Sequence, residues 1–401
     1  MSEPNPGRES RIFGIRVSIL FAAIFVVAGI NLPFLPVWLD WQGLGPREIA
    51  IITAVPLFVR VVVTPVIAFA ADQANDHRLF LIVLSWVGLG ALIALSLSSG
   101  FWPILFCSVA FALAWTTIMP LTETIALRGV KVAGLDYGRM RLWGSLSFIA
   151  ATLVGGWVVG SLGAASAVWL LVAGGILVTA AAHTLARPIG WGRLKAATTP
   201  PRLRLAEAAG LLRSPTFIVF LLAAGAVQGA HGTFYTFGTV HWASQGISAG
   251  WAGSLWAIAV IAEIVLFTYS GRILARVEPA RLIALGGAAA IIRWFFMGFD
   301  PPLGWLLPLQ ALHSLTFGAT HIGAIHYMGR AVPDSQGGTA QALYASVTGG
   351  IALGGAMLIS GPLYATWGGG AYWAMALIAA IGFAAAVWLT SRAGPFAQPQ
   401  S

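Results

Sequence analysis

The feature that most constrains this chain is its succession of apolar runs, each long enough to cross a lipid bilayer. A membrane-spanning helix needs about 20 consecutive apolar residues. Runs of this length predict twelve helices, at 13–39, 47–71, 79–98, 102–127, 140–160, 164–186, 215–241, 249–272, 280–299, 304–328, 338–365 and 370–391. Only 9% of the residues are charged, against about 25% in soluble proteins. We therefore predict an all-α membrane protein with 12 transmembrane helices.

The Lys and Arg residues are distributed unevenly between the two sides of the predicted membrane. If the N-terminus is placed inside, all of them except Arg47, Arg60 and Arg293 fall in, or at the edges of, cytoplasmic segments. Positive residues accumulate in cytoplasmic loops, so both termini are predicted to be cytoplasmic. The net charge of +9 is explained by this placement, and we expect no nucleic-acid partner.

The longest polar break divides the predicted helices into two sets of six. It covers 187–214, is basic and contains prolines. We predict an N-terminal half at 1–186, a cytoplasmic linker at 187–214 and a C-terminal half at 215–401. The end of the linker, LRLAEAAGLLR, has helical spacing and is predicted to lie on the inner membrane surface. An offset of 203 places Arg60 on Glu263, which is weak self-similarity of the kind found in duplicated transporter halves.

Three stretches carry a family resemblance. AFAADQANDHR at 68–78 resembles the loop signature of the major facilitator superfamily, with Asp72 and Arg78 at its charged positions. Glu123, followed by YGRMRLWGS with Arg141, resembles the sugar-binding pair of the lactose permease group. Most of the C-terminal half, including QGAHGTFYTF and LWAIAVIAEI, resembles the phenylpropionate permease branch.

The resemblance implies a function and a location. It implies two pseudo-symmetric six-helix halves and proton-coupled import of a small aromatic acid by alternating access across the bacterial inner membrane. Asp72 and Arg78 are then expected to form an inner gate. The chain departs from the lactose permease pattern, because Phe148 replaces the sugar-stacking tryptophan. In the predicted helix at 304–328, Gln310 and Thr316 replace the lysine and the proton-coupling glutamate around His313. Galactoside transport is therefore not expected, nor is coupling through that glutamate.

Charged residues inside the apolar spans carry independent information. Arg60, Arg141 and Arg293 outnumber Glu123 and Glu263 by one. Arginine stays protonated because its pKa lies above about 12, so an anionic substrate supplies the missing charge. A carboxylate bound bidentately by arginine is the natural solution. The count favours an organic anion over a sugar.

Four residues are candidates for proton coupling. Glu263 is the first candidate, because burial raises the pKa of a carboxyl group towards neutrality. Glu123 is the second. His313 and His231 are further candidates, since histidine titrates near physiological pH. The alternatives are structural: a Glu263–Arg293 bridge, a Glu123–Arg141 clamp between helices, and histidines that form interhelical hydrogen bonds.

Nine residues are candidates for substrate binding. Helical spacing, the intramembrane charges and the resemblance select Arg141, Arg293, Arg60, Asn31, Phe148, Tyr235, Trp256, Gln341 and Tyr344. Asn31 is included because Pro33 and Pro36 are expected to break helix 1 beside it. Unwound backbone inside a membrane is tolerated where it is buried in protein or lines a cavity.

Several classes of function are not expected. The sequence has no phosphate-binding G-x-x-x-x-G-K-[ST] loop, so ATP does not drive transport directly. His313 and His321 lie two turns apart, too far to share one metal ion, and we expect no metal or other cofactor. The sequence contains no pairing of a nucleophile with a base that would indicate an enzyme. The predicted partners are a small-molecule substrate, protons and the lipid bilayer. We predict that the protein is a monomer. The open alternatives are a sugar or nucleoside proton symporter, or a drug or metabolite efflux carrier.

Overall fold

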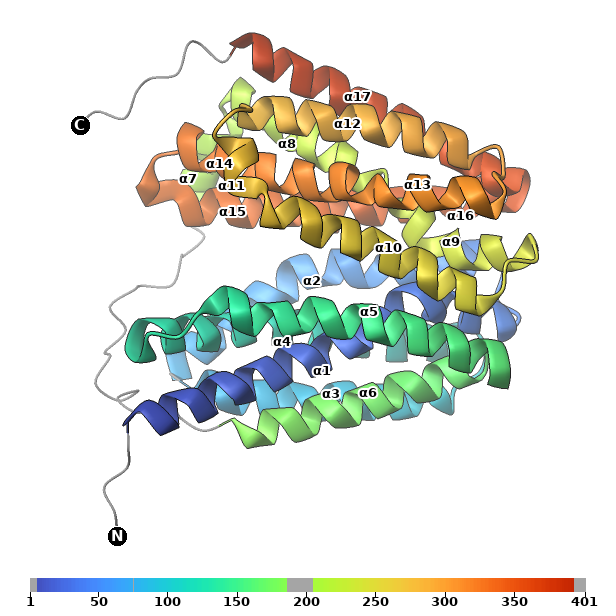
Figure 1. Cartoon of the computed structure of the whole chain (residues 1–401), viewed down its shortest axis with the longest axis horizontal. Helices are drawn as coiled ribbons and strands as arrows, with labels where there is room; N and C mark the ends of the chain where they lie inside the picture. Colours follow the sequence, from blue (N-terminus) through green and yellow to red (C-terminus); the bar gives the residue numbers. More distant parts are fainter. Residues whose placement is uncertain (1–5, 75, 186–204, 393–401) are drawn as a thin grey trace. The chain divides into compact units, whose positions relative to one another are not determined.

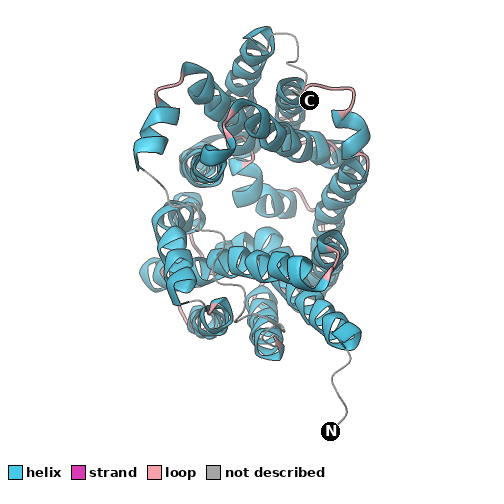
Figure 2. Ribbon diagram, turned by 90° about the vertical axis from the view of Figure 1, so that its left-hand side faces the viewer, coloured by secondary structure: helices cyan, strands magenta, loops and turns pink. Residues whose placement is uncertain are grey.

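The computed structural model describes residues 6–74, 76–185 and 205–392. These residues are almost entirely helical, and none of them forms a strand (Figure 2). The chain divides into two compact units. One contains Met1–Pro200 with Trp242–Ala257, and the other contains Pro201–His241 with Ile258–Ser401.

The first unit contains the six N-terminal helices (Figure 1). They are α1 (Pro6–Trp41), α2 (Pro46–Ala74), α3 (His77–Ser96), α4 (Phe101–Ala133), α5 (Tyr137–Leu162) and α6 (Ser166–Thr184). Side-chain caps fix where two of them begin. Asp76 accepts a hydrogen bond from the Leu79 backbone N–H at 3.0 Å, and Asp136 accepts one from the Arg139 N–H at 3.1 Å. Such caps satisfy N–H groups that have no partner within the helix.

The C-terminal part of the chain is more interrupted. Its α-helices are α7 (Leu205–Leu212), α8 (Pro215–Gly229), α9 (Gly232–Ser244), α10 (Ala249–Thr268), α11 (Ser270–Leu274), α12 (Pro279–Met297), α13 (Leu303–Ala311), α14 (Thr320–Ala331), α15 (Gly337–Ala345), α16 (Leu353–Trp367) and α17 (Ala371–Arg392). Two π-helices, η1 (Ser314–Ala319) and η3 (Ser346–Ala352), join neighbouring α-helices. Short 3₁₀ turns occupy η2 (Asp334–Gln336) and η4 (Gly368–Gly370).

Ten stretches of the described residues are long and apolar enough to cross a membrane. Twelve crossings are compatible with this number. One stretch, Gly337–Arg392, has 56 residues, about 84 Å of helix at 1.5 Å per residue and so enough for two passages. The predicted span 304–328 is divided among α13, η1 and α14. Of the predicted linker, 187–204 lies outside the described residues, whereas α7 confirms the helix predicted at its end.

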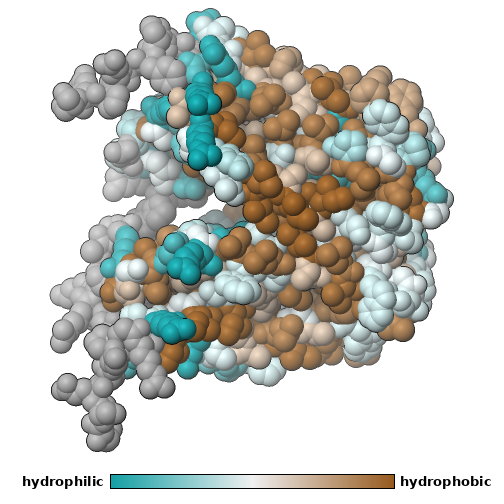
Figure 3. Space-filling model, viewed as in Figure 1, coloured by the Kyte–Doolittle hydropathy of each residue, from teal (hydrophilic) through white to brown (hydrophobic). Residues whose placement is uncertain are grey.

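The outer surface agrees with a membrane environment. Hydrophobic residues cover much of the face seen in Figure 3. Large apolar side chains are exposed there and elsewhere, including Trp157 at 70%, Leu162 at 74% and Leu377 at 70%. Soluble monomers rarely expose contiguous apolar patches of more than a few hundred Å². The chain is therefore a multi-pass membrane protein.

The two halves repeat one packing scheme. In the N-terminal unit α1 packs on α5 and α6, and α3 packs on α4 and α6. The C-terminal counterparts are α8 on η3 and α17, and α12 on η1, α14 and α17. The first helix of each half thus contacts the fifth and sixth, and the third contacts the fourth and sixth. This agrees with the predicted pseudo-symmetric six-helix halves.

The predicted break in the first helix is wrong. α1 continues through Pro33 and Pro36 to Trp41. A proline removes one backbone hydrogen bond, but membrane helices tolerate it when neighbouring helices support the backbone. Here α5 lies along α1 and provides that support. Asn31 is half-buried within a regular helix.

Close packing between α1 and α5 depends on Gly29. A Cβ atom at this position would lie 2.8 Å from the Phe148 carbonyl oxygen and 2.9 Å from the Ala151 Cβ. Gly29→Ala is therefore expected to destabilise the unit by about 1–3 kcal/mol, the usual cost of overpacking. Thermal unfolding of the detergent-purified protein measures this effect. The control is Gly90→Ala on α3, where a Cβ meets nothing within 4 Å; a loss of stability no larger than that of the control would contradict the expectation.

Candidate substrate and proton site

Arg293 is a fully buried arginine in the middle of the C-terminal unit. Its side chain comes from α12, and the residue is 0% exposed. The guanidinium carbon lies 4.8 Å from the centre of the Phe234 ring and 4.4 Å from that of the Trp294 ring. Cations over aromatic faces gain roughly 0.5–2 kcal/mol. Burial of an ion costs several kcal/mol, so further partners are needed to hold this charge.

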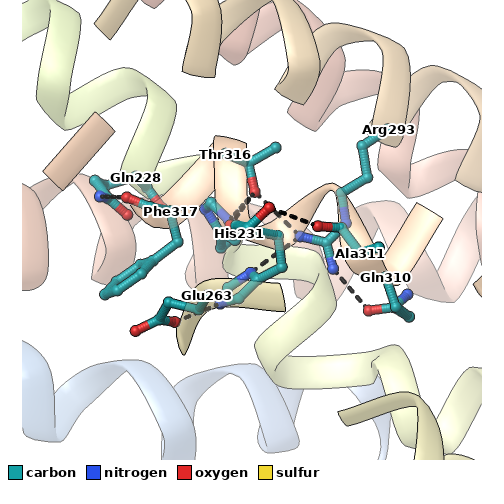
Figure 4. Close-up of polar contacts among 10 residues, drawn as sticks. Gln228, His231, Glu263, Arg293, Gln310, Ala311, Thr316 and Phe317 are labelled. Carbon is teal, nitrogen blue, oxygen red and sulfur yellow. Dashed lines mark hydrogen bonds and ion pairs between the residues drawn. The ribbon is translucent and has the colours of Figure 1, made fainter. Parts of the chain in front are cut away.

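Three neutral groups supply these partners (Figure 4). Arg293 Nη2 donates to Gln310 Oε1 at 2.7 Å. Nη1 donates to Thr316 Oγ1 at 3.2 Å and to His313 Nδ1 at 3.1 Å. Within the described residues, Arg293 forms no ion pair with a carboxylate, and its Nε has no hydrogen-bond partner. The site thus holds a cation that forms no direct ion pair with an acid of the described chain.

His313 lies between Arg293 and Glu263. Arginine has donors and no acceptor, so the Nδ1 that faces Arg293 carries no proton. The neutral ring then carries its proton on Nε2, which lies 3.7 Å from Glu263 Oε2. The alternative of a direct Glu263–Arg293 bridge is wrong, because the imidazole separates the two groups. Glu263 and Arg293 are thus linked through one titratable ring.

His231 extends the same network. Its Nδ1 lies 3.0 Å from the Gln228 carbonyl oxygen, to which it donates, and its Nε2 lies 3.0 Å from Thr316 Oγ1. A neutral ring that donates through Nδ1 accepts through Nε2, so the Thr316 hydroxyl donates to it. That hydroxyl oxygen is then free to accept from Arg293. Thr316 therefore connects the two predicted histidines with the buried arginine.

Irregular backbone positions these side chains. His231 lies between α8 and α9, where the helix that began at Pro215 is interrupted. Thr316 lies in the π-helix η1, where Gly318 approaches the Leu266 side chain: a Cβ there would lie 2.8 Å from Leu266 Cδ2. Interrupted helices and π-bulges occur frequently at binding sites of transporters and enzymes. They turn polar groups inward without leaving backbone groups facing lipid.

An aromatic ladder continues from the polar cluster. The His313 and Phe317 rings stack at 5.3 Å, and the Phe317 and His321 rings stack at 5.9 Å. Their spacing of four residues predicts one shared helix face, and the stacking confirms it. Tyr235 is half-buried and lies 5.4 Å from His231, centre to centre. The Glu263 side chain is 20% exposed, so the cluster runs from a partly exposed acid to a fully buried arginine.

Glu123 and Arg141 both lie beside Tyr137 in the N-terminal unit. Glu123 accepts a hydrogen bond from the Tyr137 hydroxyl at 3.4 Å. The Arg141 guanidinium carbon lies 4.0 Å from the centre of the Phe25 ring and 5.8 Å from that of Phe21. No ion pair joins Glu123 to Arg141 in the described part of the chain. Their predicted functional roles stay predictions.

The remaining substrate-binding candidates differ in their burial and surroundings. Arg60 is half-buried on α2, and Phe148 is buried against α1. Trp256 is buried at 3% exposure. Tyr344 is buried in an aromatic core against Phe220 and lies 3.4 Å from His321 Nδ1.

Gln341 lines a separate cavity of about 190 Å³. With it are Ile325, Met328, Gly329, Val332 and Gly337. Its role in substrate binding, like those of the preceding candidates, stays a prediction.

Asp72 and Arg78 occupy the predicted gate. His77 Nε2 lies 2.7 Å from Asp72 Oδ1, which ties the end of α2 to the start of α3. Arg78 donates to the backbone carbonyls of Leu185 and His183 at the end of α6. Each residue thus fixes helix ends within its own unit, and their role in gating stays a prediction.

Comparison with known proteins identifies the family. Residues 15–375 match the MFS_1 like family. A protein of Escherichia coli (strain K12) named "Probable 3-phenylpropionic acid transporter" is 30% identical over 88% of this chain and 92% of its own length. The chain belongs to the major facilitator superfamily. A maltose permease of Geobacillus stearothermophilus is 28% identical, with 87% of each chain covered.

Solved structures support the same fold for this major facilitator protein. The nucleoside transporter NupG superposes with a TM-score of 0.82 at 16% identity, over 94% of this chain and 98% of that one. A bacterial homologue of the lysosomal transporter Spinster superposes with a TM-score of 0.75 at 15% identity, over 99% and 100%. Together with the family match and the transporter relatives, this makes the protein a membrane transporter and not an enzyme.

Sequence reasoning missed the roles of two residues in this transporter. Gln310 and Thr316 entered only as departures from the lactose permease pattern, yet both hold the Arg293 guanidinium. A signal was available, because 310, 313 and 316 are spaced by three residues and share a helix face. Polar residues on one face of a membrane helix indicate contacts inside the bundle.

The Thr316 hydroxyl gives a specific prediction. Thr316→Val keeps the side-chain shape but removes the group that joins His231 to Arg293. Loss of a hydrogen bond to a charged group costs about 1.5–3 kcal/mol. The ratio of the maximal uptake rate to KM should therefore fall about tenfold or more. The control is Thr320→Val, because Thr320 Oγ1 is buried without a hydrogen-bond partner in the described chain. Equal activity of both variants would remove Thr316 from the site.

Proposed function

We propose that this protein is a proton-coupled importer of a small organic anion such as an aromatic acid. The observation that carries the proposal is the buried Arg293, which is held by Gln310, His313 and Thr316 and by no carboxylate of the described chain. A substrate carboxylate is a suitable counter-charge, because guanidinium donors bind it in a fork. The relative named as a 3-phenylpropionic acid transporter supports this substrate class.

The rings around Arg293 suit an aromatic substrate. Phe234 and Trp294 lie on the guanidinium, and Tyr235 lies beside His231. Aromatic rings attract one another beyond simple burial of apolar area. A substrate with a carboxylate and a ring would therefore engage both parts of the cluster.

Coupling follows from the link through His313. When a substrate carboxylate accepts hydrogen bonds from Arg293, the hydrogen bond from Arg293 to His313 Nδ1 is lost. That nitrogen is then able to bind a proton. Glu263, at 3.7 Å from His313 Nε2 and partly exposed, accepts or supplies that proton. Alternating exposure of this pair to the two sides of the membrane would couple the proton flux to substrate movement. The predicted bacterial inner-membrane location with cytoplasmic termini belongs to this proposal, as does function as a monomer.

Uptake into proteoliposomes tests the proposal. Radiolabelled 3-phenylpropionate is supplied outside, with and without an inward proton gradient. We expect gradient-driven accumulation that a protonophore abolishes and that unlabelled aromatic acids reduce by competition. Accumulation that ignores the gradient would refute proton coupling, and the absence of uptake would refute the substrate class.

A second candidate is proton symport of a sugar or nucleoside. The structural similarity to NupG and the sequence similarity to a maltose permease favour it. Gln310, Gln228 and Thr316 also offer neutral hydrogen-bonding groups in the cluster. Gradient-driven uptake of labelled maltose or uridine, unaffected by 3-phenylpropionate, would select this candidate instead.

A further inference from the structure

A second site lies in the N-terminal unit, whereas the Arg293 cluster belongs to the other unit. It is a groove of about 670 Å³ between the beginnings of α1 and α5, which lie along one another (Figure 1). Its walls are formed by Arg11, Gly14, Ile15, Ser18, Ile19, Ala22, Gly134, Leu135, Asp136, Arg139, Met140 and Trp143. Because 139 and 141 are two positions apart on α5, their side chains diverge by about 200°. The groove is therefore on the other face of α5 from Arg141.

The groove combines an apolar wall with a basic end. Ile15 and Ile19 are each 49% exposed, and Trp143 is 56% exposed. Arg11 lies one turn from Ile15 and Arg139 lies one turn from Trp143, and both arginines are exposed. The groove also holds one acid, Asp136, but its carboxylate accepts the Arg139 backbone N–H at 3.1 Å and caps α5. Within the described residues, neither guanidinium forms an ion pair.

The predicted depth of these residues in the membrane matches the division of the groove into a basic end and an apolar wall. The Lys and Arg asymmetry places the starts of α1 and α5 on the cytoplasmic side. Tryptophan is enriched where headgroups meet acyl chains, and Trp143 lies one helical turn deeper than Arg139. Basic pockets between helices on the cytoplasmic side bind anionic lipid headgroups. The arginines thus lie at headgroup level and the isoleucines at acyl-chain level.

We propose that this groove binds one anionic phospholipid from the cytoplasmic leaflet. Arg11 and Arg139 hold the phosphate diester, and Ile15, Ile19 and Trp143 contact the upper part of an acyl chain. Charge complementarity selects an anionic over a zwitterionic headgroup. The exposed apolar wall selects a lipid over a free phosphate. The proposal uses the predicted orientation but not the identity of the transported substrate.

Native mass spectrometry of the full-length protein tests the site. The detergent-solubilised protein is mixed with equal amounts of phosphatidylglycerol and phosphatidylethanolamine, and the bound lipids are counted. The wild type is expected to retain phosphatidylglycerol preferentially. The double variant R11Q/R139Q should lose at least about tenfold in that preference, since each arginine contributes a factor of about five near an anionic headgroup.

Three comparisons keep the result interpretable. R11K/R139K retains the charge and should retain most of the binding. R272Q/R392Q removes two other predicted cytoplasmic arginines, which lie beside Tyr269 and Trp388, and should bind like the wild type. Excess inorganic phosphate should not displace the lipid. Unchanged preference in R11Q/R139Q, an equal loss in R272Q/R392Q, or full displacement by phosphate would each overturn the proposal.

Discussion

Arg293→Gln is expected to lower the initial rate of substrate uptake about 100-fold. The substitution removes the cation that the proposed carboxylate binds, and removal of one partner of a buried charge pair costs about 2–5 kcal/mol. It also leaves Gln310, His313 and Thr316 without the donor that they share. Initial uptake rates at several substrate concentrations measure the change, which should appear both as a higher KM and as a lower maximal rate.

Arg293→Lys distinguishes geometry from charge. An ammonium on a flexible stem is unable to reach Gln310 Oε1 and Thr316 Oγ1 in the fork that a guanidinium forms. We expect a loss of about tenfold with the charge retained, intermediate between the wild type and Arg293→Gln. Arg272→Gln is the control, because Arg272 also lies over an aromatic ring, 5.5 Å from the centre of Tyr269, but outside the cluster. Uptake by Arg293→Gln within threefold of the wild type would show that the substrate anion binds elsewhere.

Glu263→Gln is expected to abolish the response of uptake to a proton gradient while substrate exchange continues. An inward gradient of one pH unit supplies about 1.4 kcal/mol per proton, a factor of about ten in accumulation. Glutamine keeps the shape of the side chain facing His313, but it neither binds nor releases a proton in this pH range. Accumulation by the variant should therefore fall to the level reached without a gradient. Counterflow of labelled against unlabelled substrate measures the retained exchange.

Glu123→Gln is the matched control for that experiment. Glu123 is also a carboxylate inside a predicted span, but it contacts Tyr137 in the N-terminal unit. We expect this variant to keep its response to the gradient. If Glu263→Gln keeps the response and Glu123→Gln loses it, the coupling proton belongs to Glu123. If both variants keep it, one of the histidines carries the proton.

The sequence was sufficient to predict the class of fold and several local features. Long apolar runs and few charges predict membrane helices, because a bilayer admits backbone only with its hydrogen bonds satisfied. Spacing alone placed His313, Phe317 and His321 on one face, and their rings do stack. Burial of Arg293 was predicted from its position in an apolar span, and the described structure leaves it 0% exposed.

Other features were not predictable from local pattern. Pro33 and Pro36 indicate a break when α1 is considered alone, but the packing of α5 along it allows the helix to continue. Conversely, Gly229 and Gly232 flank the interruption between α8 and α9, but glycine is also frequent in unbroken membrane helices, so local pattern did not predict it. Whether a membrane helix bends depends on the neighbours that satisfy its backbone, and these come from distant parts of the chain.

Composition and local spacing were enough to predict that this protein crosses the membrane many times, that its halves are related and that charges lie inside its spans. Each of these depends on residue type and local spacing. How the charges are connected became clear only from the way the helices pack. It placed His313 between Glu263 and Arg293 and gave Gln310 and Thr316 to the guanidinium. Hydrogen bonds act over about 3 Å, so their partners are fixed only when helices that are distant in sequence pack together.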